Sequence, residues 1–261
     1  GFKLCRNGLS YSYETCIGEI EKAISREKFV TTDWNRTGTI IQQEILSDYI
    51  AYIKTRVNIE KKLKVIIDAG NGTCGFTKSV FEDLGCDVKI LYPEPDGRFP
   101  NHIPDPLKKE TLQDLSYAVT REKANIGISF DGDGDRVGFV DEKGRIIHGD
   151  SVCIMFAREI LKRQSKAKIV LNVLNSKALV EDIESKDGIP IMTKVGHSYI
   201  QETLVKEKAA FAGEISGHYY FGIDHYGYDD GILTAAKMCE LLSKETQPLS
   251  IMVDQIPRYP S

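Results

Sequence analysis

Short apolar runs alternate with longer helix-like segments along most of the chain. Between residues 64 and 147, apolar runs such as Val65-Ile66-Ile67 are followed by amphipathic stretches such as Thr73–Leu84. The alternation restarts after Gly149-Asp150. Strands that alternate with helices are typical of a mostly parallel sheet with helices on both faces. The pattern therefore predicts an α/β fold with two successive, mixed but mostly parallel sheet domains.

The spacing of apolar positions predicts the individual elements. We expect strands at residues 65–67, 88–91, 125–130, 137–140, 145–147, 168–173, 190–193 and 210–212. We expect helices at residues 73–84, 107–123, 151–164, 176–185, 197–208 and 230–242, the last with Asp230 as its cap.

The N-terminal region has a different pattern. A helix is expected near Tyr13–Ile24, and a second one around Gln42–Thr55 should bury an apolar face made of Ile45, Tyr49, Tyr52 and Ile53. The chain begins without Met and ends without a closing element, so we expect a piece of a longer polypeptide. We interpret residues 1–46 as the remnant of a first α/β domain, 47–147 as the second domain and 148–261 as the third.

Composition narrows the class of protein. A hydrophobic content of 41% and a charged content of 28% are typical of a soluble globular chain. The net charge of −4 leaves no basic surplus for nucleic acid, and no apolar run approaches the roughly 20 residues that span a bilayer. The six cysteines are scattered without paired spacing. We therefore expect a cytoplasmic protein with reduced thiols that binds neither nucleic acid nor a membrane.

The strongest chemical signal is Asp131-Gly132-Asp133-Gly134-Asp135-Arg136. Three ionised carboxylates this close raise each other's pKa unless a cation or an arginine offsets their charge. The glycines allow the backbone to fold tightly enough for the three side chains to converge. Carboxylate oxygens are ligands that Mg²⁺ prefers, and phosphate oxygens and water usually complete its shell. The loop therefore predicts a Mg²⁺ site beside a phosphate.

Two other interpretations compete with a Mg²⁺ site in this loop. An EF-hand calcium loop has the same acidic spacing, and Glu142 falls at its twelfth position. That loop requires glycine at its sixth position, where this chain has Arg136, and the preceding residues 125–130 form an expected strand instead of a helix. The other alternative is a solvated turn with incidental acids.

A glycine-rich loop offers a different function. Gly70-Asn71-Gly72-Thr73-Cys74-Gly75 fits the G-x-G-x-x-G pattern of dinucleotide-binding folds, between an expected strand and helix. Such sites also need an acidic residue at the end of the second strand, whereas Glu94 and Asp96 lie beyond it. A nicotinamide-dependent oxidoreductase is the alternative function, and a tight strand-to-helix turn is the structural alternative.

Two polar loops suggest a phosphorylated, polyhydroxylated ligand. Glu214, Ser216 and His218 alternate in a loop after an expected strand, and such groups pair with substrate hydroxyls. Lys194 and His197 lie at the start of an expected helix, where anions bind. Taken singly, these residues also suit a surface turn or solvated surface. Together with the acidic loop they favour a phosphorylated substrate.

Several motifs, in order and nearly end to end, resemble the alpha-D-phosphohexomutase family and its phosphomannomutase/phosphoglucomutase branch. They are Gly1–Lys3, Ile67–Gly72, Asp96–Asn101, Phe130–Arg136, Lys194–Ser198, Gly213–His218 and Asp229–Gly231. Members of this family have four domains around a cleft. The resemblance implies that this chain carries the end of the first domain, all of the second and third, and none of the fourth.

The resemblance implies a reversible shift of phosphate between the 1- and 6-positions of glucose or mannose phosphate. A phosphoserine gives its phosphate to the sugar, and the bisphosphorylated sugar reorients and returns the other phosphate. The implied Mg²⁺ ligands are Asp131, Asp133 and Asp135. Arg136 would steady the serine phosphate, and Lys3 matches a lysine near the reacting hydroxyl.

The implied substrate-binding residues are Glu214, Ser216, His218, Lys194, His197 and Lys177. Relatives often carry arginine at the position of Lys177, and a lysine cannot make the bidentate phosphate contact of an arginine. The serine loop and the fourth domain's phosphate loop have no counterpart in this chain. We therefore expect the chain alone to be inactive, with its missing first- and fourth-domain segments and the hexose phosphate as its partners.

Overall fold

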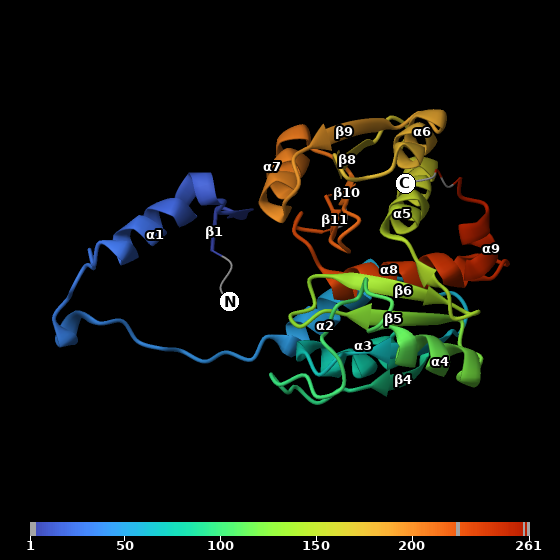
Figure 1. Cartoon of the computed structure of the whole chain (residues 1–261), viewed down its shortest axis with the longest axis horizontal. Coiled ribbons are helices and arrows are strands. Elements are labelled where there is room, and N and C mark those ends of the chain that lie inside the picture. Colours follow the sequence, from blue (N-terminus) through green and yellow to red (C-terminus); the bar gives the residue numbers. More distant parts are fainter. Residues whose placement is uncertain (1–3, 223–224, 258, 260–261) are drawn as a thin grey trace.

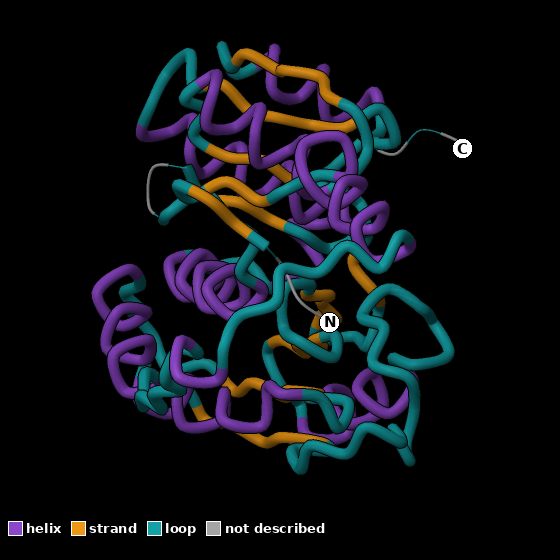
Figure 2. Tube along the Cα trace, turned by 90° about the vertical axis from the view of Figure 1, so that its left-hand side faces the viewer, coloured by secondary structure: helices purple, strands orange, loops and turns teal. Residues whose placement is uncertain are grey.

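The computed structural model describes residues 4–222, 225–257 and 259. The chain forms two α/β units and an N-terminal segment that lies to one side of them (Figure 1). Seen from the side, the strands gather in two separate groups, each flanked by helices (Figure 2). The predicted fold class, two mixed and mostly parallel sheet domains after a remnant of another unit, is confirmed.

The first unit contains a five-stranded sheet in the order β4-β3-β5-β6-β7. The strands are β3 (Lys64–Asp68), β4 (Asp87–Leu91), β5 (Ile126–Phe130), β6 (Val137–Asp141) and β7 (Ile146–Ile147). Strand β3 is parallel to β4 and β5, whereas β6 and β7 are antiparallel additions. Helices α3 (Thr77–Asp83), after the 3-10 turn Thr73–Phe76, and α4 (Gln113–Glu122) accompany it. Strand β5 is buried along its whole length, as expected of a strand covered on both faces.

The second unit contains a four-stranded sheet in the order β11-β10-β8-β9. The strands are β8 (Lys168–Asn172), β9 (Ile189–Thr193), β10 (Phe211–Gly213) and the antiparallel β11 (Tyr219–Phe221). The helices are α5 (Gly149–Arg163), α6 (Lys177–Ser185), α7 (His197–Glu207), α8 (Gly231–Lys244) and α9 (Leu249–Asp254). Helix α8 lies against β6 of the first unit (Figure 1), and one buried apolar cluster runs through both units.

Helix α2 (Leu46–Arg56) ties the first unit to the chain that precedes α8. The Tyr49 hydroxyl donates to both carboxylate oxygens of Asp230, at 2.9 and 3.0 Å. The Tyr52 hydroxyl lies 2.7 Å from Nδ1 of His225. Asp230 also caps α8, because its side chain accepts the backbone N–H of Leu233. The predicted cap is confirmed, and α2 thereby fixes the start of α8.

The N-terminal segment contains the hairpin β1 (Cys5–Arg6) and β2 (Leu9–Ser10), a π-helical turn (Tyr13–Ile17), α1 (Gly18–Ser25) and a 3-10 turn (Trp34–Arg36). Its hairpin contacts α7, since Gln201 accepts from the Ser10 N–H at 3.0 Å and donates to the Gly8 carbonyl at 3.1 Å. The predicted burial of Ile45 is wrong, because this side chain precedes α2 and is 64% exposed. Ile53, in contrast, is buried as predicted.

Other differences from the predicted elements have local causes. The helix expected at 107–123 begins only at Gln113, because residues 107–112 form turns in which the Thr111 hydroxyl donates to the carbonyls of Asp105 and Lys108. Strand β11 and helix α9, at three and six residues, were not predicted. All six cysteines lie in the described part of the chain and are free. Among the described residues, no helix is both long and apolar enough to span a bilayer.

Candidate functional site

The loop between β5 and β6, residues 131–136, brings its three carboxylates together. One oxygen each from Asp131, Asp133 and Asp135 lies within 4.8 Å of the others. Asp131 is buried at the end of β5, Asp133 is exposed and Asp135 is half-buried. Strands lie on both sides of the loop, as the sequence predicted, so the helix-flanked EF-hand interpretation is wrong. We call residues 131–136 the metal loop.

Asp131 holds the metal loop in its folded shape. Its Oδ1 accepts the backbone N–H groups of Gly134 and Arg136 at 3.0 and 3.1 Å, and its Oδ2 accepts Nε of Arg136 at 2.8 Å. Gly134 adopts a left-handed conformation at φ +79°, which favours glycine. Burial, together with the charge of Asp135, raises the pKa of Asp131 to about 6 despite the bonds from Arg136. A further positive charge near these carboxylates would stabilise their ionised forms.

The metal loop suits a small divalent cation. Its donors are all carboxylate oxygens, which are ligands that Mg²⁺ prefers, and they lie within 4.8 Å of one another. Beside it lies a cavity of about 240 Å³ whose lining includes four aspartates as well as apolar side chains. The residues that line this cavity include Tyr49, Thr73, Asp133, Asp135, Asp229 and Asp230.

The glycine-rich loop at residues 70–75 packs against the metal loop. The backbone N–H of Thr73 donates to the Gly132 carbonyl at 3.0 Å. A Cβ on Gly72 would lie 2.8 Å from the same carbonyl oxygen, and one on Gly75 would lie 2.0 Å from the Pro93 carbonyl oxygen. Backbone of the neighbouring loops thus lies directly against Gly72 and Gly75. This contact supports the tight-turn interpretation, in which these glycines allow close packing of loops.

The loop after β10, residues 214–218, presents its carboxylate in a buried setting. Glu214 is 3% exposed, and its Oε1 accepts Nδ2 of Asn172 at 2.7 Å. Burial acts to raise the pKa of Glu214, but hydrogen bonds from His218 and Asn172 outweigh it and hold the pKa below its usual range. Glu214 is therefore an ionised acceptor with a fixed orientation. We call residues 214–218 the sugar loop, after its predicted role.

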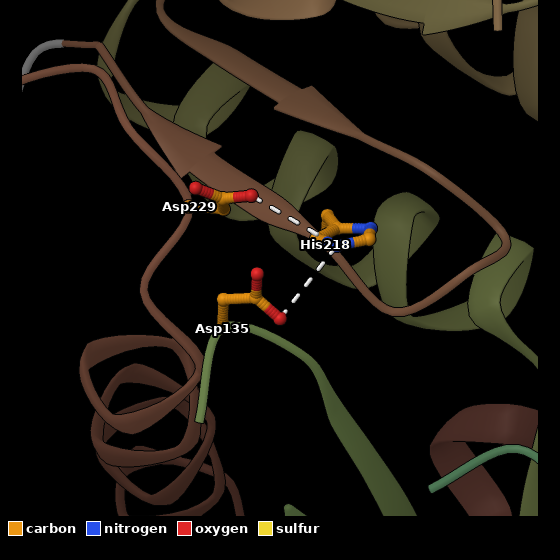
Figure 3. Close-up of side chains that lie close together, drawn as sticks. All are labelled: Asp135, His218 and Asp229. Atoms are coloured by element: carbon orange, nitrogen blue, oxygen red, sulfur yellow. Dashed lines mark ion pairs between the residues drawn. The ribbon is translucent and has the colours of Figure 1, made fainter. Parts of the chain in front are cut away.

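The imidazole of His218, the last residue of the sugar loop, faces Asp135 of the metal loop and Asp229 (Figure 3). Its Nδ1 is 2.9 Å from Oγ of Ser216 and 3.3 Å from Oε2 of Glu214. Its Nε2 is 3.7 Å from Oδ1 of Asp135 and 3.9 Å from Oδ2 of Asp229. Burial acts to lower the pKa of His218, but the bond to Glu214 and the charges of Asp229 and Asp135 raise it above the ordinary value.

Backbone contacts join the metal loop to the second unit at two points. The N–H of Val137 donates to the Gly217 carbonyl of the sugar loop at 3.0 Å. The N–H of Gly231, the first residue of α8, donates to the Gly134 carbonyl at 3.1 Å. A Cβ on Gly231 would lie 2.6 Å from that carbonyl oxygen, so glycine is needed for this approach. The metal loop is therefore fixed between the sugar loop and the start of α8.

The predicted anion-binding residues lie at the rim. Lys194 is exposed after β9, with Nζ 5.4 Å from the centre of the Tyr199 ring, and half-buried His197 is the first residue of α7. Their loop reaches the sugar loop, because the backbone N–H of Gly196 is close enough to Glu214 to help lower the pKa of that carboxyl. Among the interactions described for these residues, the side chains of Lys194 and His197 do not contact Glu214, Ser216 or His218.

Lys177 occupies a different place from the other predicted residues. Its side chain is 79% exposed at the start of α6 and pairs with Glu181 at 3.1 Å. It lines a cavity of about 580 Å³ that also contains Ile215 of the sugar loop and Asp150. Lys3 lies outside the described residues.

Three polar residues of the site were not predicted as functional. Asn172 ends β8 and anchors Glu214, while Asp229 and Asp230 place two carboxylates at the start of α8. The acidic pair directly before the helix glycine was the available signal: it belongs to the motif Asp229–Gly231 and predicted a cap, but no role in the site was assigned to either carboxylate. Asn172 carried no such local signal, since its partner lies 42 residues away.

Comparison with known proteins identifies related families and structures. The family model described as phosphoglucomutase/phosphomannomutase, alpha/beta/alpha domain II, matches residues 47–144, and that for domain III matches residues 148–259. A phosphomannomutase/phosphoglucomutase of Pseudomonas syringae pv. tomato is 40% identical over 94% of this chain and 52% of its own length. A phosphoglucomutase of Neisseria gonorrhoeae is 37% identical over 99% of this chain and 55% of its own.

Solved structures agree with this. A phosphoglucomutase/phosphomannomutase family protein from Burkholderia thailandensis has a TM-score of 0.88 and 36% identity over 95% of this chain and 53% of its own. An Aspergillus fumigatus N-acetylphosphoglucosamine mutase, solved with GlcNAc-6P and magnesium, shares the fold at a TM-score of 0.61 and 16% identity, over 82% of this chain and 53% of its own. The chain spans about half the length of the curated relatives it matches.

Proposed function

Because the chain belongs to the phosphoglucomutase/phosphomannomutase family and carries its domains II and III, we propose that it forms the metal- and sugar-binding centre of a phosphohexomutase. The reaction is the reversible interconversion of 1- and 6-phosphates of glucose or mannose. It proceeds through a phosphoserine and a bisphosphorylated sugar. We propose domain boundaries of 1–46, 47–147 and 148–261.

The observation that carries this proposal is the junction of the two loops. The hydrogen bond from Val137 to Gly217 and the placement of His218 bring a trio of carboxylates next to an ordered Glu214. A phosphohexomutase needs a cation at the transferred phosphate and hydrogen-bonding groups at the sugar ring. Both requirements meet at one junction in this chain.

On the metal side, Asp131, Asp133 and Asp135 would hold Mg²⁺. When bound, Mg²⁺ would offset the charge that develops on the phosphate during transfer. Arg136 donates through Nε to Asp131, and its side chain is 31% exposed. The rest of its guanidinium is therefore available to a phosphate oxygen. The magnesium in a mutase of the same fold supports this assignment.

On the sugar side, Glu214 would accept hydrogen bonds from ring hydroxyls, with Asn172 fixing its orientation. Ser216 would add a second hydroxyl contact and is itself oriented by His218. A site built to pair with hydroxyls rejects analogues that lack them. Lys194, His197 and Lys177 are the cations that would meet the sugar's phosphate at the rim, and Lys3 would act near the reacting hydroxyl.

The transferring serine is not among this chain's motifs, so we propose that the 261 residues alone do not turn over substrate. The test is a coupled assay that follows glucose 6-phosphate formed from glucose 1-phosphate. It is run on this chain and on the full-length product of its gene. We expect turnover only by the full-length product, and substitution of Asp133 by Asn should abolish it. An unchanged rate in that variant would refute the proposed role of the metal loop.

A further inference from the structure

The Asp135 carboxylate belongs to two clusters of potential ligands. With Asp131 and Asp133 it forms the oxygen trio of the metal loop, and with His218 and Asp229 it forms a second cluster of similar spacing. The side chain of Asp135 has one orientation at a time, so contact with His218 competes with the approach of the same carboxylate to a cation in the metal loop. The strength of the contact between His218 and Asp135 therefore affects cation binding.

Asp229 is placed to limit the contact between His218 and Asp135. It faces the same ring nitrogen of His218 as Asp135 does, from the opposite unit (Figure 3). Its backbone forms a bridge to Tyr220, whose hydroxyl also donates to Oδ2 of Asp229 at 3.3 Å. The next residue, Asp230, caps α8. Asp229 is thus held from both sides by the second unit's framework, whereas Asp135 lies in a loop.

The other ring nitrogen of His218 is committed to the sugar loop through Ser216 and Glu214. The imidazole therefore contacts the metal loop, the sugar loop and the start of α8. Asp135 and Asp229 both face Nε2. If the ring moved toward one of them, its contact with Glu214 through Nδ1 would change as well, because the ring is rigid.

We propose that Asp229 is a positioning residue: it holds His218 toward the second unit, so that Asp135 stays available to a divalent cation. Cation binding and sugar-loop geometry are thereby coupled through one imidazole. The inference rests on the proposed function, from which it takes the metal loop as a Mg²⁺ site. Coupling of this kind is reciprocal, and such couplings typically change affinity by about 5- to 150-fold.

The test is a double-mutant cycle on the whole 261-residue chain, with Mg²⁺ affinity measured by calorimetry. The variants are D229N, H218Q and the two combined. The control is D187N, which makes the same charge change at an exposed position of the second unit. We expect D229N to weaken Mg²⁺ binding about fivefold or more. The same substitution should matter less than about twofold when His218 is already Gln.

Two results would overturn the inference and leave the proposed function standing. D229N could weaken binding by the same factor in both backgrounds, which indicates a direct field effect on the cation. D229N could also behave as D187N does. If D229N does not fold, Y220F takes its place, since it frees Asp229 from its hydroxyl partner, and the same dependence on His218 is expected with a smaller factor.

A spectroscopic readout separates the inference from the proposed function. In NMR spectra of the wild-type chain, Mg²⁺ should shift the amide signals of residues 131–136 and the ring signals of His218, but not those of exposed His148. Shifts of the loop amides without any change at His218 would contradict the inference alone. An absence of loop shifts would overturn both the inference and the proposed Mg²⁺ site.

Discussion

The acidic and the basic residues of the proposed site are held in different ways. Asp131 and Glu214 are buried, and each accepts hydrogen bonds that fix its orientation. Lys194 and Lys177 are exposed, and their described partners are one aromatic ring and one glutamate on their own surface. The part that would bind metal and sugar hydroxyls is therefore preorganised, whereas the cations that would meet a phosphate are free to adjust.

The largest effect should come from removing the anchor of the sugar loop. N172A leaves the buried Glu214 without its 2.7 Å hydrogen bond and also raises the pKa of that carboxyl. Loss of a hydrogen bond to a buried charged group costs about 3 kcal/mol. Urea unfolding should show this loss of unfolding free energy. A change below about 0.5 kcal/mol would mean that the acidic side is not preorganised by Asn172.

A smaller effect is expected from G231A, at the contact between α8 and the metal loop. The added Cβ would lie 2.6 Å from the Gly134 carbonyl oxygen and 3.0 Å from that of Arg136, so the loop must move. Overpacking of this kind costs about 2 kcal/mol, and Mg²⁺ affinity should fall as well. The control is G97A, where a Cβ meets nothing within 4 Å. Equal stability of the two variants would contradict the proposed role of this contact.

An ion pair beside the glycine-rich loop, between His102 and Asp68, should make the stability of the fold depend on pH. His102 Nε2 lies 3.0 Å from the buried Asp68 carboxylate, and this hydrogen bond raises the pKa of His102 to about 9. A raised histidine pKa stabilises the fold fully below the unfolded value near 6.5 and loses that contribution as pH rises through about 9. We expect the wild type to lose about 1 to 2 kcal/mol between pH 7 and 10 relative to H102Q. Parallel stability curves for the two proteins would refute this.

The smallest effect is expected on the basic side. K177A removes an exposed ion pair with Glu181, and such pairs contribute less than about 0.5 kcal/mol. The unfolding free energy should hardly change, while the Michaelis constant of the full-length enzyme for hexose phosphate should rise. A stability loss as large as that of N172A would remove the contrast between the two sides.

The residues of the site that could be predicted are those whose functional partners lie close to them in the sequence. The metal loop was predicted because its three carboxylates and its glycines lie within six residues of sequence. Glu214, Ser216 and His218 were found for the same reason. Asn172 acts through Glu214, 42 residues away, so no local pattern marks its role. Asp229 stands in the recognised motif Asp229–Gly231, but its approach to His218 is visible only in the fold.

The fold shows the same division. Long apolar runs gave the central strands, such as β5, within one residue of their observed ends. The start of α4 was wrong, because Thr111 side-chain bonds hold residues 107–112 in turns although their composition suits a helix. Ile45 was expected to be buried from its spacing alone, but it lies just before α2, where the helical period does not apply.

The central claim is that the metal loop binds a divalent cation directly beside the sugar loop. Crystals of this chain soaked in Mn²⁺ and measured at a wavelength where manganese scatters anomalously would test it most directly. We predict one strong anomalous peak within ligand distance of Asp131, Asp133 and Asp135. A map without that peak, or with its only peak among Asp135, His218 and Asp229, would contradict the account.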